Sequence, residues 1–325
     1  MPADVGVDAG GSGTTAVAIV EGRRTIVELA PANPSAAGIE SAALTIGDAI
    51  AAAVAPAAPR SVVVGAAGAG RADVAAALGD ELLRRFAGAH IEVIDDARLA
   101  LHAADAAGRG IVLIAGTGSI AYGENGERRA RCGGGGYAIG DEGSGYAIGA
   151  AGLRLALRAF DGRGSVDRTV AAISERIGAR DRDALLAYAY DAPSTVAAVA
   201  SVAATIVECA NAGERSALTI VQQAARELFE LVRAVAAAID ASSEMPLVLH
   251  GGVLRTPSTL TYLLETHLAK RRYMVVPDAS QAEITIKTQL QQLVQLNEGQ
   301  PYTYDRAALV KMLDEALVGS RPKTH

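Results

Sequence analysis

Three short turns rich in glycine, serine and threonine carry the clearest chemical signal in this sequence. They are residues 8–15 (DAGGSGTT), 116–119 (GTGS) and 250–252 (HGG), and each follows a short apolar run typical of a β-strand. Consecutive backbone N–H groups in such turns converge on phosphate oxygens, and Ser and Thr hydroxyls add donors. One such turn also fits an ordinary glycine-rich hairpin, but three at strand ends predict a site for a phosphorylated ligand.

The same turns exclude two common phosphate-binding motifs. No Gly-Lys-Ser/Thr follows a glycine run, which excludes a P-loop, and the turns lead into strands rather than helices, which excludes a dinucleotide fingerprint. Asp8 ends the first strand, and a carboxylate repels phosphate, so it is predicted to act through Mg²⁺ and water. The residues predicted to bind a nucleotide are Gly10, Gly11, Ser12, Thr14, Thr15, Gly116, Thr117, Ser119, Gly251 and Gly252.

Two adjacent aspartates, Asp95 and Asp96, lie where a predicted strand meets a predicted helix. Phosphoryl transfer to a hydroxyl needs mainly positioning and charge neutralisation, plus one carboxylate that receives the hydroxyl proton. A carboxylate at the end of a strand is well placed for that task. Either aspartate also suits the N-cap of the helix, and one can cap while the other faces a substrate.

The segment 132–145 (CGGGGYAIGDEGSG) has few side chains, and close approach of a ligand is the usual reason for such a composition. Asp141 is predicted to bind that ligand, with Glu142 and Gly118 beside it. The alternative for the two acidic residues is capping of a helix that begins near Ser144.

The order of strand and helix patterns indicates an α/β fold in two related lobes. Strands are predicted over residues 4–8, 14–20, 25–29, 61–65, 91–94, 110–115 and 246–250, and helices over 35–54, 72–86 and 96–107. The helix over 35–54 is expected to begin with a serine cap. The strand–turn–strand pattern restarts near residue 110, so the predicted domains are residues 1–112 and 113–325. The second includes a mainly helical region over 143–240.

Composition narrows the class of protein. A net charge of -6 and a pI near 5.5 argue against nucleic acid or an anionic membrane as a partner. The two cysteines, Cys132 and Cys209, are far apart and form no metal-binding motif. No secretion signal or apolar run long enough to cross a bilayer is predicted, so the expected location is the cytoplasm.

The motifs, taken in order, resemble the BadF/BadG/BcrA/BcrD-type ATPase family. The matching stretches are residues 8–15, 96–97, 116–119, 132–144 and 250–253, and the resemblance covers about residues 4–255. Within the family the sequence is most similar to N-acetylglucosamine kinases. The resemblance implies two ribonuclease-H-like lobes of the actin/hexokinase type, with ATP between them and a hexose facing the γ-phosphate.

The resemblance also implies roles for individual residues and a reaction. Asp96 would be the base, and Asn33 would hydrogen-bond sugar hydroxyls, although asparagine before proline also suits a turn. The reaction would transfer the γ-phosphoryl group of ATP to the 6-hydroxyl of N-acetylglucosamine or a close relative. The adenosine would lie near Gly251 and Gly252.

The sequence departs from the family pattern at two places. Animal N-acetylglucosamine kinases have a tryptophan where this chain has Gly135, which leaves glucosamine and N-acetylmuramic acid open as substrates. Cys132 matches a cysteine of related kinases and is interpreted as a packing residue. The segment after Pro277 resembles nothing in the family and is predicted to form a long terminal helix with contacts in a homodimer.

Two other functions fit the sequence less well. The family includes ATP-driven activators of 2-hydroxyacyl-CoA dehydratases, which hold a [4Fe–4S] cluster through cysteines of two subunits, but neither cysteine here has their flanking pattern. An ATP-sensing regulator of the kind formed by repressors related to sugar kinases would need a DNA-binding arm, and the chain begins at its first predicted strand.

Overall fold

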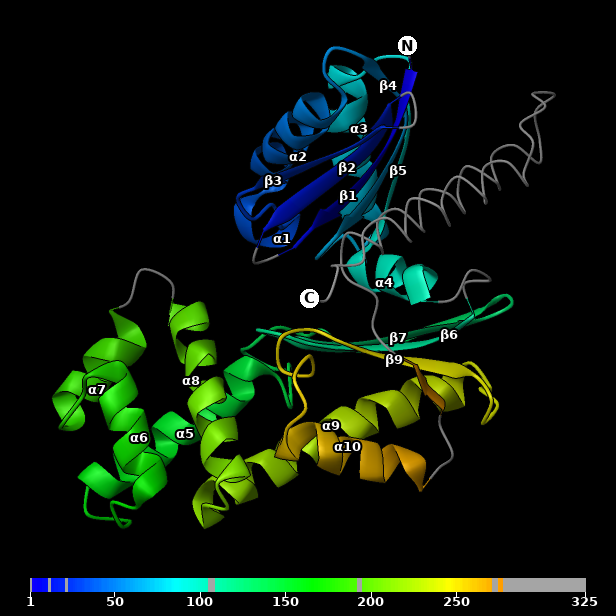
Figure 1. Cartoon of the computed structure of the whole chain (residues 1–325). Helices are drawn as coiled ribbons and strands as arrows, with labels where there is room; N and C mark the ends of the chain where they lie inside the picture. The colour runs from blue at the N-terminus through cyan, green and yellow to red at the C-terminus, as the bar shows by residue number, and fades with distance from the viewer. Residues whose placement is uncertain are drawn as a thin grey trace, which may run out of the picture.

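The computed structural model describes residues 2–10, 13–20, 23–104, 109–191, 195–270 and 274–276, and it contains two sheets in two α/β lobes (Figure 1). The strands are β1 Pro2–Ala9, β2 Thr14–Val20, β3 Arg23–Leu29, β4 Ala58–Ala66, β5 His90–Asp95, β6 Gly110–Ala115, β7 Ser119–Asn125, β8 Arg128–Gly133, β9 Pro246–His250 and β10 Met274–Val276. The helices are α1 Pro34–Ala37, α2 Ile39–Val54, α3 Ala72–Arg85, α4 Asp96–Ala104, α5 Gly145–Phe160, α6 Arg168–Ile177, α7 Arg182–Tyr190, α8 Thr195–Asn211, α9 Arg215–Ala238 and α10 Thr259–Ala269. The predicted α/β fold in two lobes is confirmed.

The two sheets repeat one topology. The first has the strand order β3-β2-β1-β4-β5, with β1 antiparallel to β2 and parallel to β4. The second has the order β10-β9-β6-β7-β8, with β6 antiparallel to β7 and parallel to β9. In each sheet a three-strand meander is extended by parallel strands on the other side of its first strand. The restart of the sequence pattern near residue 110 therefore corresponds to a second copy of this arrangement.

Helix α4 lies between the two sheets, α2 and α3 cover the outer face of the first sheet, and α9, with α10 packed against it, covers the outer face of the second (Figure 1). Successive side chains of β4 point to opposite faces of the sheet. Val62 and Val64 face the core under α2 and α3, whereas Val63 packs with Leu99 of α4 on the other face. In the second sheet, Val112 of β6 packs against α4, whereas its neighbours on either side face the core under α9. Both sheets are thus apolar on two faces, as expected for strands covered by helices on each side.

Helices α5 to α8 form a separate helical region beside the second sheet, and their buried residues join the core of that lobe (Figure 1). This agrees with the helical region predicted over 143–240. Helix α10 and strand β10 were not predicted. The predicted terminal helix after Pro277 lies outside the described residues, and the proposed division between residues 112 and 113 falls within β6.

The single helix predicted over 35–54 is wrong in two respects. Gly38, at φ +84°, separates α1 from α2, because this backbone conformation cannot continue a helix. The cap is Asn33 rather than a serine, since Pro34 occupies the first helical position and the Asn33 side chain accepts a hydrogen bond from the Ser35 N–H (2.8 Å).

Candidate functional site

The carboxyl ends of three parallel strands bring the candidate aspartates to one edge of the first sheet. The register aligns Asp8 with Gly65 and Gly65 with Ile94, so Asp8 of β1 and Asp95 of β5 lie at the same edge with β4 between them. Asp8 is 9% exposed. A side chain at Gly65 would collide with Leu99, and its absence lets α4 pack closely over this edge.

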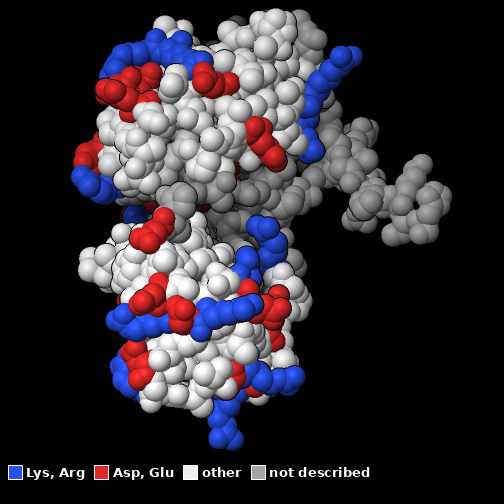
Figure 2. Space-filling view, turned by 90° about the vertical axis from the view of Figure 1, so that its left-hand side faces the viewer, with Lys and Arg blue, Asp and Glu red and all other residues white. Residues whose placement is uncertain are grey.

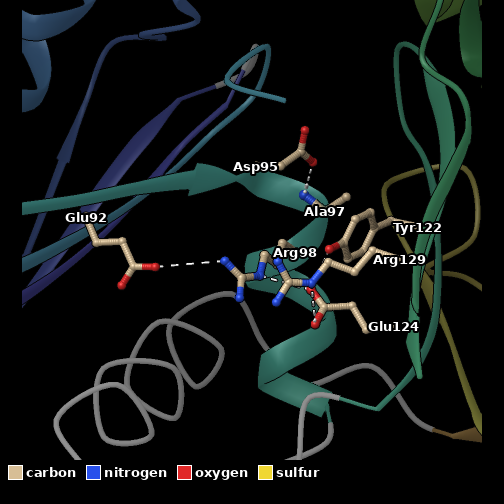
Figure 3. Close-up of polar contacts among 7 residues, drawn as sticks. All are labelled: Glu92, Asp95, Ala97, Arg98, Tyr122, Glu124 and Arg129. Carbon is tan, nitrogen blue, oxygen red and sulfur yellow. Dashed lines mark hydrogen bonds and ion pairs between the residues drawn. The ribbon is translucent and has the colours of Figure 1, made fainter. Parts of the chain in front are cut away.

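Asp95 and Asp96 form the junction between β5 and α4. The Ala97 N–H donates to Oδ1 of Asp95 (2.9 Å), so the carboxylate of Asp95, the residue before α4, caps the helix (Figure 3). The same N–H donates to Oδ1 of Asp96 (2.9 Å). Because the Ala97 N–H donates to both carboxylates, capping alone does not distinguish them, and the role of Asp96, the first residue of α4, as the base stays a prediction.

The pKa of Asp96 is raised to about 7, first by burial, then by the neighbouring carboxylate of Asp95 and by Asp8. Asp96 keeps some exposed surface, but protein surrounds it deeply enough to disfavour its charge. A carboxylate with a pKa near neutrality is suited to accept a proton at physiological pH.

The first turn is described in part. The Gly10 N–H donates to the carbonyl oxygen of Gly13 (2.9 Å), and Thr15 pairs with Asp8 across the hairpin; Gly11 and Ser12 lie outside the described residues. The buried Thr14 hydroxyl donates to the carbonyl oxygen of Ala30 (2.8 Å). A phosphate contact from that hydroxyl would require this bond to break.

The second turn is joined to the glycine-rich segment that follows β8. The Ser119 N–H donates to Oδ1 of Asp141 (3.2 Å), and the Ser119 hydroxyl donates to the carbonyl oxygen of Glu142 (2.7 Å). Asp141 has φ +60°, unusual for a residue with a side chain, and a Cβ at Gly118 would approach its Oδ2 to 2.8 Å. Thr117 is exposed at the tip of the turn. Gly118 therefore makes room for Asp141.

The Asp141 carboxylate accepts hydrogen bonds from backbone N–H groups and does not cap a helix. Burial raises its pKa, whereas hydrogen bonds from backbone N–H groups oppose that change. The cap of α5 is Ser144, whose hydroxyl oxygen accepts from the Ala147 N–H (3.2 Å). Capping does not account for Asp141, and its predicted role toward a ligand stays a prediction.

The third turn lies against the second. Gly251, at φ +100°, is packed so closely on the Ala115 carbonyl that a side chain could not fit, and the Val253 N–H donates to the same oxygen (3.0 Å). The first N–H groups of α5 donate to the carbonyl oxygens of Gly116 (2.8 Å) and Thr117 (3.1 Å). Gly252 is exposed beside this turn. Two of the three predicted nucleotide turns are therefore neighbours.

Sequence reasoning missed the loop over residues 67–71 (AGAGR), which joins β4 to α3. Its Gly68 lies against the side chains of Asn33 and Ser35, and its Gly70 lies against Asp95 and Arg131. The loop thus contacts one predicted sugar-binding residue and the residue next to the predicted base. Two glycines so close to a strand end were the signal that the sequence offered.

A polar network joins α4 to the second sheet (Figure 3). Glu124 of β7 is 5% exposed, and its carboxylate accepts hydrogen bonds from Arg98 Nε (2.9 Å) and from the Tyr122 hydroxyl. Arg129 Nε lies 3.5 Å from the same carboxylate, and Arg98 also lies 3.8 Å from Glu92 of β5. Burial and the adjacent Glu124 carboxylate raise the pKa of Tyr122, which keeps its hydroxyl protonated as a donor.

The distribution of charge on the surface and the apolarity of the helices do not point, among the described residues, to a further binding partner. On the face shown in Figure 2, basic and acidic side chains are interspersed over both lobes. No single helix of the described segments is long and apolar enough to cross a membrane; α8 and α9 pass that test only together, across a bend of 114°.

Comparison with known proteins identifies the family. The model of the BadF/BadG/BcrA/BcrD ATPase family matches residues 5–282. The chain belongs to this family. The resemblance stated from the motifs is thereby confirmed.

Similar proteins include two kinases. An N-acetylmuramic acid/N-acetylglucosamine kinase of Clostridium acetobutylicum is 32% identical over 63% of this chain and 67% of its own length. An N-acetyl-D-glucosamine kinase of Dictyostelium discoideum is 31% identical over 48% of this chain and 50% of its own. The chain thus spans between half and two thirds of these relatives.

A solved structure supports the fold. A Chromobacterium violaceum protein assigned as an N-acetylglucosamine kinase superposes with a TM-score of 0.68 at 24% identity, covering 88% of this chain and 99% of the other. A likeness at this identity shows the fold alone, and it agrees with the two-lobe architecture.

Proposed function

We propose that this protein is an ATP-dependent amino-sugar kinase, which transfers the γ-phosphoryl group to the 6-hydroxyl of N-acetylglucosamine or a close relative. The observation that carries the proposal is the pair of adjacent aspartates at the sheet edge, where Asp95 caps α4 and burial together with the carboxylates of Asp95 and Asp8 raises the pKa of Asp96 to about 7. Family membership and two relatives named as amino-sugar kinases support it. Glucosamine and N-acetylmuramic acid are the other candidate substrates.

The nucleotide would lie among the three turns. The phosphates would be held by those backbone N–H groups of the first two turns, residues 10–15 and 116–119, that do not already donate within the protein, as those of Gly10 and Ser119 do. Gly251 and Gly252 would lie near the adenosine. The close packing of Gly251 on Ala115 supports this, because it makes the second and third turns neighbours.

Mg²⁺ suits the residues present. Among the described residues no three or more His, Cys, Asp or Glu side chains cluster to hold a metal by themselves. Magnesium in nucleotide sites takes one or two carboxylates together with substrate phosphates, and the largely buried carboxylate of Asp8 would supply such a ligand, directly or through water. Bound there, Mg²⁺ would neutralise phosphate charge during transfer.

The protein's own groups would orient the sugar and take up its proton. Asn33 and Asp141 would hydrogen-bond sugar hydroxyls, with Glu142 and Gly118 beside them. Asp96 would accept the proton of the 6-hydroxyl as the new O–P bond forms, which contributes about 10²–10⁴ in rate. Phosphoryl transfer asks little more than this positioning and charge stabilisation.

The assay that tests the proposal is ADP release from ATP across a panel of sugars. N-acetylglucosamine, N-acetylmuramic acid or glucosamine should stimulate ADP release well above the rate without sugar, and Asp96→Asn should lower kcat about a hundredfold or more. Asp183→Asn, which changes a carboxylate 94% exposed on α7, is the matched control and should keep normal turnover. Release of ADP at one rate with and without every sugar would contradict the proposal.

The dehydratase-activator alternative gains no support. Cys209 is buried in α8 and Cys132 lies in β8, where it packs against the core of the second lobe as the sequence suggested. We further propose that the protein acts on a small-molecule sugar as a homodimer in the cytoplasm. Its two domains are proposed to divide near residue 112.

A further inference from the structure

One face of the β7–β8 hairpin is polar and is turned toward α4. The strand register pairs Tyr122 with Arg131 and Glu124 with Arg129, and residues two apart on a strand share a face. The alternate residues of the hairpin, which include Ala121 and Cys132, pack against the core on the other side of the sheet. Tyr122 packs with α4 and the residues beneath it. We call these four residues, Tyr122, Glu124, Arg129 and Arg131, the hairpin face.

The hairpin face holds α4 at two points. Glu124 accepts from Arg98 in the first full turn of the helix (2.9 Å), a bond to a carboxylate that is almost wholly buried (Figure 3). A buried carboxylate is costly without its donors, so this contact fixes where the helix lies on the second sheet.

The second contact between the hairpin face and α4 is an ion pair with Asp95, the residue before the proposed base Asp96. Arg131 Nη1 lies 3.6 Å from Oδ2 of Asp95, and Oδ1 of the same carboxylate caps α4 through the Ala97 N–H. The Asp95 side chain is 14% exposed and the Arg131 side chain 43%. Gly70 leaves the room for this ion pair, because a Cβ there would collide with both partners.

The same strand connects this ion pair to the second turn. Arg131 is opposite Tyr122, which follows Ser119 by three residues along β7, or about 10 Å of extended chain. Asp95 comes from the first lobe and Arg131 from the second. The pair therefore ties the start of α4 to the lobe that carries the turn 116–119.

We propose that Arg131 is a positioning residue for phosphoryl transfer: by holding Asp95, it fixes the carboxylate of Asp96 relative to the nucleotide turn of the second lobe. The inference rests on the proposed function. Its physical reason is that displacement of a reacting group by about 1 Å can cost about a hundredfold in rate. The Arg131 side chain is 43% exposed, and an ion pair with so exposed a partner contributes little to folding stability. A purely structural role of Arg131 would therefore change neither Tm nor kcat by much.

The test compares Arg131→Ala and Arg131→Lys with Arg128→Ala, which removes an arginine from the same strand whose ion pair with Asp240 is exposed. Arg131→Ala should lower kcat about tenfold, with the KM for ATP and the KM for sugar changed by less than about twofold. Arg131→Lys should recover part of kcat because it restores the charge. Arg128→Ala should match wild type in kcat, and all three should melt within about 2 °C of it.

A double-mutant cycle adds an independent measurement. If Arg131 acts through Asp95, kcat of Asp95→Asn/Arg131→Ala should be no lower than that of Asp95→Asn alone. Additive losses, or an unchanged kcat in Arg131→Ala, would overturn the inference while leaving the kinase proposal intact. A higher sugar KM at unchanged kcat would make Arg131 a substrate contact and would also overturn it. A wild-type protein inactive with every sugar would instead contradict the proposed function on which the inference depends.

Discussion

The ionisation of Asp96 should make folding stability depend on pH in an unusual direction. Aspartates usually have lowered pKa values in folded proteins, but Asp96 is raised from 3.8 to about 7 by burial and by the carboxylates of Asp95 and Asp8. Between those two values the folded chain binds more protons at this site than the unfolded chain. The Asp96 contribution to stability is therefore lost as pH rises from about 4 to about 7, and it is constant above that range.

Asp96→Asn removes this effect while keeping the shape of the side chain. Full ionisation of a carboxyl whose pKa rises from 3.8 to about 7 on folding costs about 4 kcal/mol, most of it between pH 5 and pH 8. The stability of the variant relative to wild type should therefore increase by about 2–3 kcal/mol from pH 5 to pH 8. Any constant effect of the new amide cancels in this comparison.

Thermal unfolding at several pH values measures the difference, without Mg²⁺ or nucleotide, because a bound cation would favour the ionised carboxylate. For a chain of 325 residues, 2–3 kcal/mol corresponds to a relative change of about 4 °C in Tm. Asp183→Asn, at an exposed position, is the control and should show a much smaller change. A difference between Asp96→Asn and wild type that stays constant from pH 5 to pH 8 would refute the reasoning about burial.

Three further predictions concern catalysis and motion. The kcat/KM of the enzyme for Mg·ATP, which reports the ionisation of the nucleotide-free enzyme, should fall as pH decreases below about 7, because Asp96 becomes protonated; a flat profile from pH 5.5 to 8 would argue against Asp96 as the base. Gly118→Ala should raise the sugar KM, because its Cβ would approach Asp141 Oδ2 to 2.8 Å, and steady-state kinetics with an unchanged KM would separate Asp141 from the sugar. The two lobes should close on substrates, so small-angle scattering should give a smaller radius of gyration with sugar and a non-hydrolysable nucleotide than without them.

Features set by local sequence could be predicted. The strands over 14–20, 110–115 and 246–250 match β2, β6 and β9, because each is a short apolar run bounded by glycine or proline. The two-lobe architecture followed from the repeated strand–turn–strand pattern. That one of the two aspartates caps α4 could also be predicted, because aspartate is favoured at the N-cap, but the residues left open that it is Asp95.

Features set by long-range contacts could not be predicted. The pKa of Asp96 depends on Asp8 from a different strand, and the ion pair of Asp95 depends on Arg131 from the other lobe. Glu124 was not singled out in the sequence, and its burial arises only where α4 packs on the second sheet. The division of the predicted helix at Gly38 is a local feature that the prediction missed, because a single glycine between two helical patterns is only a weak signal for a helix end.

The most direct test of the central claim is the position of phosphate on the product. Purified protein, ATP and N-acetylglucosamine should yield a sugar phosphate whose phosphorus–proton couplings in NMR place the phosphate on oxygen 6, with one ADP formed per sugar consumed. The 6-deoxy sugar, which keeps every other hydroxyl, should give neither product nor ADP above the rate without sugar. Phosphate on another oxygen, or equal ADP release with the 6-deoxy sugar, would contradict the account.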